Sequence, residues 1–125
     1  MRAAKQRMLM ALMMLGLVAL PGAALAQWRT LGDAEIEGVL SGRTVLYDRV
    51  GWQIFGATGR TVFRAEEAAM GQISVGEWRV IDNRYCQRWS RVADWACYTL
   101  DYDGADGVRF TDALGNPSAG RFAPP

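Results

Sequence analysis

Hydrophobic and polar residues alternate along residues 76–88, in two short runs separated by an Asp-Asn dipeptide at 82–83. Side chains on a β-strand point to opposite faces in turn, so this alternation predicts two strands that each bury one face. Asp and Asn favour the left-handed backbone of a two-residue hairpin turn, which pairs Ile81 with Arg84. We therefore expect an antiparallel hairpin at the centre of the fold.

The two cysteines extend this pattern to a third strand. Cysteines of exported proteins are mostly paired, and a disulfide between Cys86 and Cys97 places Tyr85 opposite Tyr98. The hairpin and the disulfide then agree on which side chains share a face. The predicted core face consists of Trp78, Val80, Tyr85, Tyr98 and Leu100, and the opposite face of Glu77, Arg79, Arg84, Cys86, Arg88, Cys97, Thr99 and Asp101.

A helix and several more short strands are predicted around this stretch. Ile36, Val39 and Leu40 have helical spacing, and Thr30 with Asp33 fits the capping-box pattern at a helix start. Short β-branched and aromatic runs between glycines indicate strands. The pattern predicts a helix at 31–41 and strands at 44–47, 52–55, 60–64, 76–81, 84–89, 95–100, 108–111 and 118–122, with one helical turn or a loop at 65–70.

These elements predict a mainly β (α+β) fold. One N-terminal helix is followed by an antiparallel meander of seven or eight short strands, which curls into a small barrel held by one disulfide. We expect the helix to plug or cover an open end; a flat sheet with the helix across one face is the alternative. The large rings predict a filled interior: Trp52, Phe55, Phe63, Trp78, Tyr85, Tyr98 and Phe110.

Residues 1–26 have the pattern of a signal peptide. A basic start precedes an apolar run from Met8 to Leu20, and Ala24-Leu25-Ala26 fits a cleavage site. The run is shorter than the roughly 20 residues that span a bilayer, so no membrane span is expected after cleavage. Residues 27–125 then form a single small β-rich domain, which we expect in the periplasm or outside the cell.

The charge of residues 27–125 excludes several function classes. Without Arg2, Lys5 and Arg7, 11 of the 14 basic residues remain against 13 acidic ones, a net charge of −2 with no lysine and no histidine. Such a chain offers no basic field for nucleic acid. It also lacks the most common general base and the lysine of Schiff-base chemistry. We therefore expect no enzyme and no cofactor, with a carboxylate-dependent hydrolase built on Glu77, Asp94 or Asp101 as the weakest alternative.

The face that carries the cysteines is the first candidate site. It gathers Arg79, Arg84, Arg88 and Arg91 near Trp95. Guanidinium groups beside an indole ring suit anionic or sugar-like ligands through forked hydrogen bonds and cation–π contacts. The alternative is a solvated face on which neighbouring carboxylates neutralise the arginines.

The Asp-rich segment 101–107 has two interpretations. Asp101, Asp103 and Asp106 offer oxygen ligands at short spacing, as calcium sites do. The EF-hand spacing is missing, however, and Asp with Gly is also typical of a hairpin loop. We favour the loop and expect no metal.

Some short segments resemble a group of small exported bacterial proteins with a domain of unknown function. The similar segments include Leu40-Ser41-Gly42-Arg43-Thr44, Gly76-Glu77-Trp78, Tyr85-Cys86 and Cys97-Tyr98, within 31–122. Some similar proteins carry a dihydrodipicolinate reductase label, but this sequence has no Gly-x-Gly-x-x-Gly after a strand and no βαβ unit. The resemblance implies a fold and no chemistry.

The sequence therefore predicts an exported β-protein that binds something without transforming it. The first hypothesis is a protein-interaction module of the cell envelope, whose partner is a protein, the cell wall or a small anionic ligand. The second is a lipocalin-like carrier of a small apolar ligand inside the barrel.

Overall fold

The computed structural model describes residues 27–66 and 71–125, which form a closed barrel of eight antiparallel strands with one helix and one extra strand. The predicted signal peptide and part of the uncertain 65–70 segment lie outside the described residues. The elements are β1 (Arg29–Thr30), α1 (Asp33–Leu40), β2 (Arg43–Tyr47), β3 (Gly51–Phe55), β4 (Arg60–Ala65), β5 (Ile73–Ile81), β6 (Arg84–Arg88), β7 (Ala96–Tyr102), β8 (Gly107–Thr111) and β9 (Pro117–Phe122).

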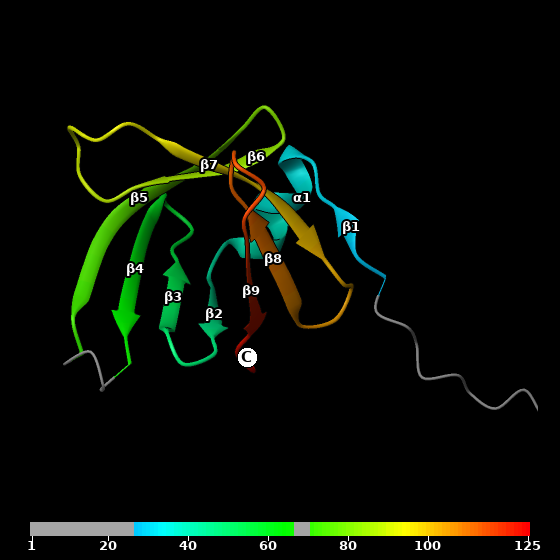
Figure 1. The fold of residues 1–125 in the computed structure, drawn as a ribbon, viewed down its shortest axis with the longest axis horizontal. Coiled ribbons are helices and arrows are strands. Elements are labelled where there is room, and N and C mark those ends of the chain that lie inside the picture. Colours follow the sequence, from blue (N-terminus) through cyan, green and yellow to red (C-terminus); the bar gives the residue numbers. More distant parts are fainter. Residues whose placement is uncertain (1–26, 67–70) are drawn as a thin grey trace, which may run out of the picture.

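The barrel is a strict meander. Each strand from β2 to β9 pairs antiparallel with the next one along the chain, and β9 returns to β2 through Val45–Phe122 and Leu46–Arg121 to close the sheet. Figure 1 shows β2 to β5 side by side, with β6 and β7 crossing above them. The predicted barrel is confirmed, and the flat sheet is wrong because β2 and β9 pair.

The central hairpin has the predicted register. Asp82 and Asn83 both have positive φ, 52° and 58°, which is the backbone of the expected two-residue turn. Ile81 pairs with Arg84, and Cys86 pairs with Cys97 in the next strand. The disulfide joins these two cysteines. Two independent constraints, the turn and the covalent link, thus set the same inward face.

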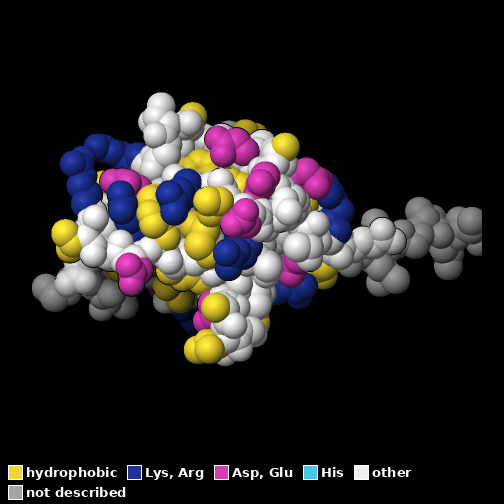
Figure 2. Space-filling model, turned by 90° about the horizontal axis from the view of Figure 1, so that it is seen from above, with side chains coloured by type: hydrophobic (Ala, Val, Ile, Leu, Met, Phe, Trp, Pro, Cys, Tyr) yellow, Lys and Arg dark blue, Asp and Glu magenta, His cyan; other side chains and the backbone are white. Residues whose placement is uncertain are grey.

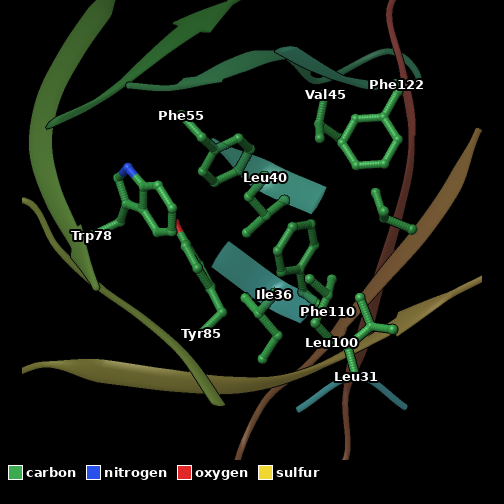
Figure 3. Packing of buried hydrophobic residues seen from close by; sticks show 11 residues of the cluster. Leu31, Ile36, Leu40, Val45, Phe55, Trp78, Tyr85, Leu100, Phe110 and Phe122 are labelled. Carbon is green, nitrogen blue, oxygen red and sulfur yellow. The ribbon is translucent and has the colours of Figure 1, made fainter. Parts of the chain in front are cut away.

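The helix closes one end of the barrel. Ile36 and Leu40 are fully buried, and Figure 3 shows them among rings contributed by the surrounding strands. Phe55 is central to this packing, with ring centroids 5.5 Å from Tyr85 and 5.9 Å from Trp78. The core cluster consists of Leu31, Ile36, Leu40, Val45, Phe55, Trp78, Tyr85, Leu100, Val108, Phe110 and Phe122.

The N-terminal part of the domain differs from the prediction. The helix begins after Gly32 and not at residue 31, and the side chain of Thr30 does not cap it. Thr30 instead belongs to β1, which pairs with β7, and its hydroxyl donates to Asp101 Oδ1 at 2.6 Å. The strand β1 was not predicted, because a two-residue strand leaves no periodicity in the sequence.

Two other expectations change. The strand β5 begins at Ile73, so the chain from 73 to 75 is strand. Trp52 is not in the core: on β3 the buried residues are Gly51, Gln53 and Phe55, so Trp52 and Ile54 face outward.

Candidate functional site

The barrel end opposite α1 contains a cavity of about 590 Å³. The direction of β2 shows the location, because this strand starts beside the helix at Arg43 and ends at Tyr47, whose ring lines the cavity. Six of the residues that line it are aromatic: Tyr47, Phe63, Tyr85, Trp89, Tyr98 and Phe110. The sequence predicted an interior filled with side chains. In the structure, side chains fill the barrel only at the end that the helix closes.

A polar cluster lies on the inner wall of this cavity, between it and the core. Gln53 is 5% exposed and Thr61 is fully buried; they are the buried polar side chains of the described part of the chain. Gln53 Nε2 lies 2.9 Å from Thr61 Oγ1 and 3.1 Å from the Tyr85 hydroxyl, and the Tyr47 hydroxyl donates to Gln53 Oε1 at 3.1 Å. Burying amides and hydroxyls without partners would be costly, so these bonds fix the cluster in one geometry.

Two tyrosines of this cluster are held as neutral hydroxyls. Burial raises the pKa of Tyr47 well above its usual range, and the nearby Tyr98 adds to the effect. Burial also raises the pKa of Tyr85, followed by the effect of Tyr47, although the hydrogen bond with Gln53 opposes it. Both groups therefore remain hydrogen-bond donors at any physiological pH.

Trp89 forms part of the rim, and Gly76 makes its position possible. A Cβ atom at Gly76 would lie 2.7 Å from Trp89 Cε3 and 2.5 Å from the Arg88 carbonyl oxygen. No side chain fits there without displacing the indole. Trp89 is 38% exposed, so its fluorescence can report on the cavity mouth.

The predicted arginine face is only partly assembled. The guanidinium carbons of Arg79 and Arg88 lie 4.1 Å and 4.5 Å from the centre of the Trp95 ring. Arg88 also pairs with Glu77 at 3.0 Å, and Arg91 approaches the same carboxylate at 3.8 Å. These cations are thus already in contact with an indole or a carboxylate of the chain itself.

Arg84 stands apart from this group. It is exposed, and in the described part of the chain its guanidinium forms no ion pair and no cation–π contact. On the face drawn in Figure 2, basic and acidic side chains are interspersed around hydrophobic ones. The arginine face lacks a single-sign field and is the weaker of the two candidate sites.

Two of the three aspartates proposed as a weak metal site form hydrogen bonds within the fold. Asp101 accepts hydrogen bonds from Arg109 Nε and Nη2, both at 3.1 Å. Asp103 Oδ1 accepts the backbone N–H groups of Ala105 and Gly107 and shapes the β7–β8 loop. Residues 27–66 and 71–125 contain no group of three His, Cys, Asp or Glu placed to hold a metal ion. Hydrogen bonds within the chain thus occupy two of these carboxylates, and the described residues give the metal interpretation no support.

Sequence reasoning missed the polar cluster, although one signal was present. Gln87 lies two residues after Tyr85 on β6, so its side chain points to the same, inward face that the hairpin register defines. A polar residue on a core-facing position is unusual and marks either a hydrogen-bonded cluster or a cavity wall. Gln53 gave no such signal. Its neighbours Trp52 and Ile54 are more hydrophobic, so the alternation along this strand predicts that they face inward and that Gln53 faces outward.

Comparison with known proteins adds no assignment: no family model, no curated protein and no solved structure matches the chain. In the described ranges, no helix is both long enough and apolar enough to span a membrane.

Proposed function

We propose that this protein binds a small, mainly apolar molecule in the open end of its barrel. The observation that carries the proposal is the cavity of about 590 Å³, which combines an aromatic wall with a few fixed polar groups. Ligand sites are mostly apolar hollows of roughly 300–1,000 Å³ with a small number of placed polar groups, and barrel mouths are a common location. The cavity is therefore of the size and composition that small-molecule carriers use.

The chemistry of the lining favours binding over catalysis. Among the described residues that line the cavity, Asp48 is the one charged side chain. Ser74 and Ser118 are also present, but in the described part of the chain neither hydroxyl is hydrogen-bonded to a carboxylate that would activate it. Neutral tyrosines and amides can orient a ligand, and they are poor acids and bases near pH 7.

Export belongs to the same proposal. A disulfide that staples two barrel strands persists in an oxidising compartment, and residues 1–26 have the pattern of a signal peptide. The proposed setting is the periplasm or the extracellular space, where a carrier meets small apolar molecules before they cross a membrane.

The experiment is a titration of oxidised residues 27–125 with N-phenyl-1-naphthylamine, a neutral dye that fluoresces in apolar surroundings. We expect saturable binding of one dye per folded chain, accompanied by a change in Trp89 emission that the variant Trp89→Phe lacks.

Two neighbouring substitutions provide a matched comparison. Ser74→Phe fills the cavity from inside, whereas Val75→Phe adds the same ring on the outer face, where Val75 is 53% exposed. The dye should bind Val75→Phe normally and Ser74→Phe at least about tenfold more weakly, which corresponds to roughly 1.4 kcal/mol. Equal binding to both folded variants, or no saturable binding to the unmodified protein, would refute the proposal.

A further inference from the structure

One backbone carbonyl fixes the orientation of the polar cluster in the cavity. The Thr61 hydroxyl donates its single proton to the carbonyl oxygen of Ile54 at 2.9 Å. Toward Gln53 the same oxygen can therefore only accept. The Gln53 atom that lies 2.9 Å from it must be the amide nitrogen. The side-chain amide of Gln53 thus has one allowed orientation.

This orientation passes to the tyrosines. Because Gln53 Nε2 faces Thr61, Gln53 Oε1 faces the Tyr47 hydroxyl at 3.1 Å, and Tyr47 must donate to it. The second Nε2 proton is directed at the Tyr85 hydroxyl and at Gln87 Oε1, 3.1 Å and 3.2 Å away. The Tyr85 hydroxyl accepts from Gln53 and donates to Gln87 Oε1 at 2.7 Å. The hydroxyl protons of Thr61, Tyr47 and Tyr85 are therefore all donated within this hydrogen-bond network.

Gln87 is the last member of the network and borders the cavity. Its Oε1 accepts from both Tyr85 and Gln53, so this atom must be the oxygen. Its Nε2 is the other end of the amide, and in the described residues neither Nε2 proton has an acceptor. Since Gln87 lines the cavity, the network ends in an unused N–H donor at the ligand site.

The charge and shape of the cavity restrict the ligand further. No arginine lines it among the described residues, and Asp48 would repel an anion. The six aromatic side chains of the wall favour a flat ring system, because offset and edge-to-face contacts between rings add to the burial of apolar area.

From these observations we infer that the ligand is an uncharged aromatic molecule whose carbonyl-type oxygen accepts a hydrogen bond from the side-chain amide of Gln87. This inference rests on the proposed function and specifies the chemical class that the same cavity selects. A ligand with a hydroxyl donor at this position gains less, because the lone pairs of Gln87 Oε1 are already used.

The test compares two ligands of nearly equal shape, 2-acetylnaphthalene and 2-ethylnaphthalene, as competitors of N-phenyl-1-naphthylamine on oxidised residues 27–125. The ketone oxygen replaces two hydrogens of the ethyl group. A net hydrogen bond of about 1 kcal/mol predicts that the ketone binds roughly fivefold to tenfold more tightly. Naphthalene-2-carboxylate should compete least.

Two variants locate the preference. Gln87→Leu should bring the ketone-to-ethyl ratio close to one, and Gln87→Glu, which replaces the donor by an acceptor, should reverse it. Val75→Phe, which changes the exposed outer face and no residue of the cavity wall, should leave the ratio unchanged.

The outcomes separate the inference from the proposed function. If both naphthalenes displace the dye equally well from the unmodified protein, the inference is overturned and the proposed function stands. If the dye itself does not bind, both are overturned. The comparison on the unmodified protein needs no variant, so misfolding of Gln87→Leu would not remove the test.

Discussion

Asp33 and Asn83 hold each other's backbone although 50 residues separate them in the sequence: the Asp33 N–H donates to Asn83 Oδ1 at 3.0 Å, and the Asn83 N–H donates to an Asp33 carboxylate oxygen. Asp33 is the first residue of α1, and Asn83 lies in the turn between β5 and β6. The first N–H of the helix is therefore capped from another part of the fold. Gly32 permits the approach, because a Cβ there would lie 3.1 Å from Asn83 Oδ1.

This pair predicts coupled losses of stability. Asp33→Ala removes the acceptor of the Asn83 N–H, and Asn83→Gly removes the cap while retaining a residue that tolerates the φ of 58°. Each change should lower the free energy of unfolding by about 1 kcal/mol. Because the two side chains serve one contact, the double variant should lose clearly less than the sum of the single losses in urea titrations. Full additivity would contradict the reciprocal contact.

Removal of the disulfide should destabilise the barrel without changing its register. Cys86 and Cys97 close a loop with a sequence separation of 11, for which chain entropy gives a stabilisation of roughly 3 kcal/mol. Urea unfolding of Cys86→Ala/Cys97→Ala, compared with the oxidised protein, measures this loss. Near-ultraviolet circular dichroism should keep its native shape, since the turn at 82–83 and the core rings set the same register independently. A collapsed spectrum at low temperature would mean that the disulfide alone sets the strand pairing.

High pH should unfold the protein through its buried tyrosines. Burial raises the pKa values of Tyr47 and Tyr85 above 10.0, the value of an exposed tyrosine. Above about pH 10 the unfolded chain releases these protons while the folded chain retains them, so the free energy of unfolding falls as the pH rises. Below that pH the two tyrosines add no pH dependence.

Tyrosinate absorbance tests this expectation. The signals of Tyr47 and Tyr85 should appear together with the loss of near-ultraviolet circular dichroism, and Tyr47→Phe should reduce the alkaline loss of stability. Titration of both groups around pH 10 with the native spectrum intact would contradict their burial as neutral donors.

The Thr61 hydroxyl should contribute more than its size suggests. Thr61→Val keeps the shape but removes the acceptor of Gln53 Nε2, which is buried, and the donor to the Ile54 carbonyl. Leaving buried polar groups unsatisfied costs about 1–3 kcal/mol, which thermal unfolding would detect as a lower Tm. Thr58→Val, in the β3–β4 turn, is the matched control and should change stability by less than about 0.5 kcal/mol. Equal effects of the two changes would exclude a structural role for the hydrogen-bond network.

The arginine face and the cavity show how far sequence reasoning reached for the site. Side chains alternate between the two faces of a strand, and this alternation correctly placed Arg79 and Arg88 on the same face as Trp95, where they make contact with its ring. The alternation of side chains does not show that Glu77 pairs with Arg88, since side-chain rotamers decide that contact. It also gives no sign of empty space, which depends on the summed volumes of side chains from several strands.

The sequence by itself determined the hairpin register, the cysteine pairing, the buried stripe of the helix and the class of the fold. Each of these depends on contacts between near neighbours in the chain or on a covalent link, so the period of two, the turn residues and the cysteine positions are sufficient. Tertiary structure alone decided the closure of β9 on β2, the strand β1, the cap from Asn83 and the inward orientation of Gln53 in place of Trp52.

The physical reason is the distance between the partners. Gln53 becomes a favourable inward residue only because Thr61, Tyr85 and Gln87, on two other strands, satisfy its amide. No local pattern encodes such a set, because each member by itself reads as an ordinary polar or aromatic strand residue. The cavity and its donor therefore arise where the closed barrel brings those strands together.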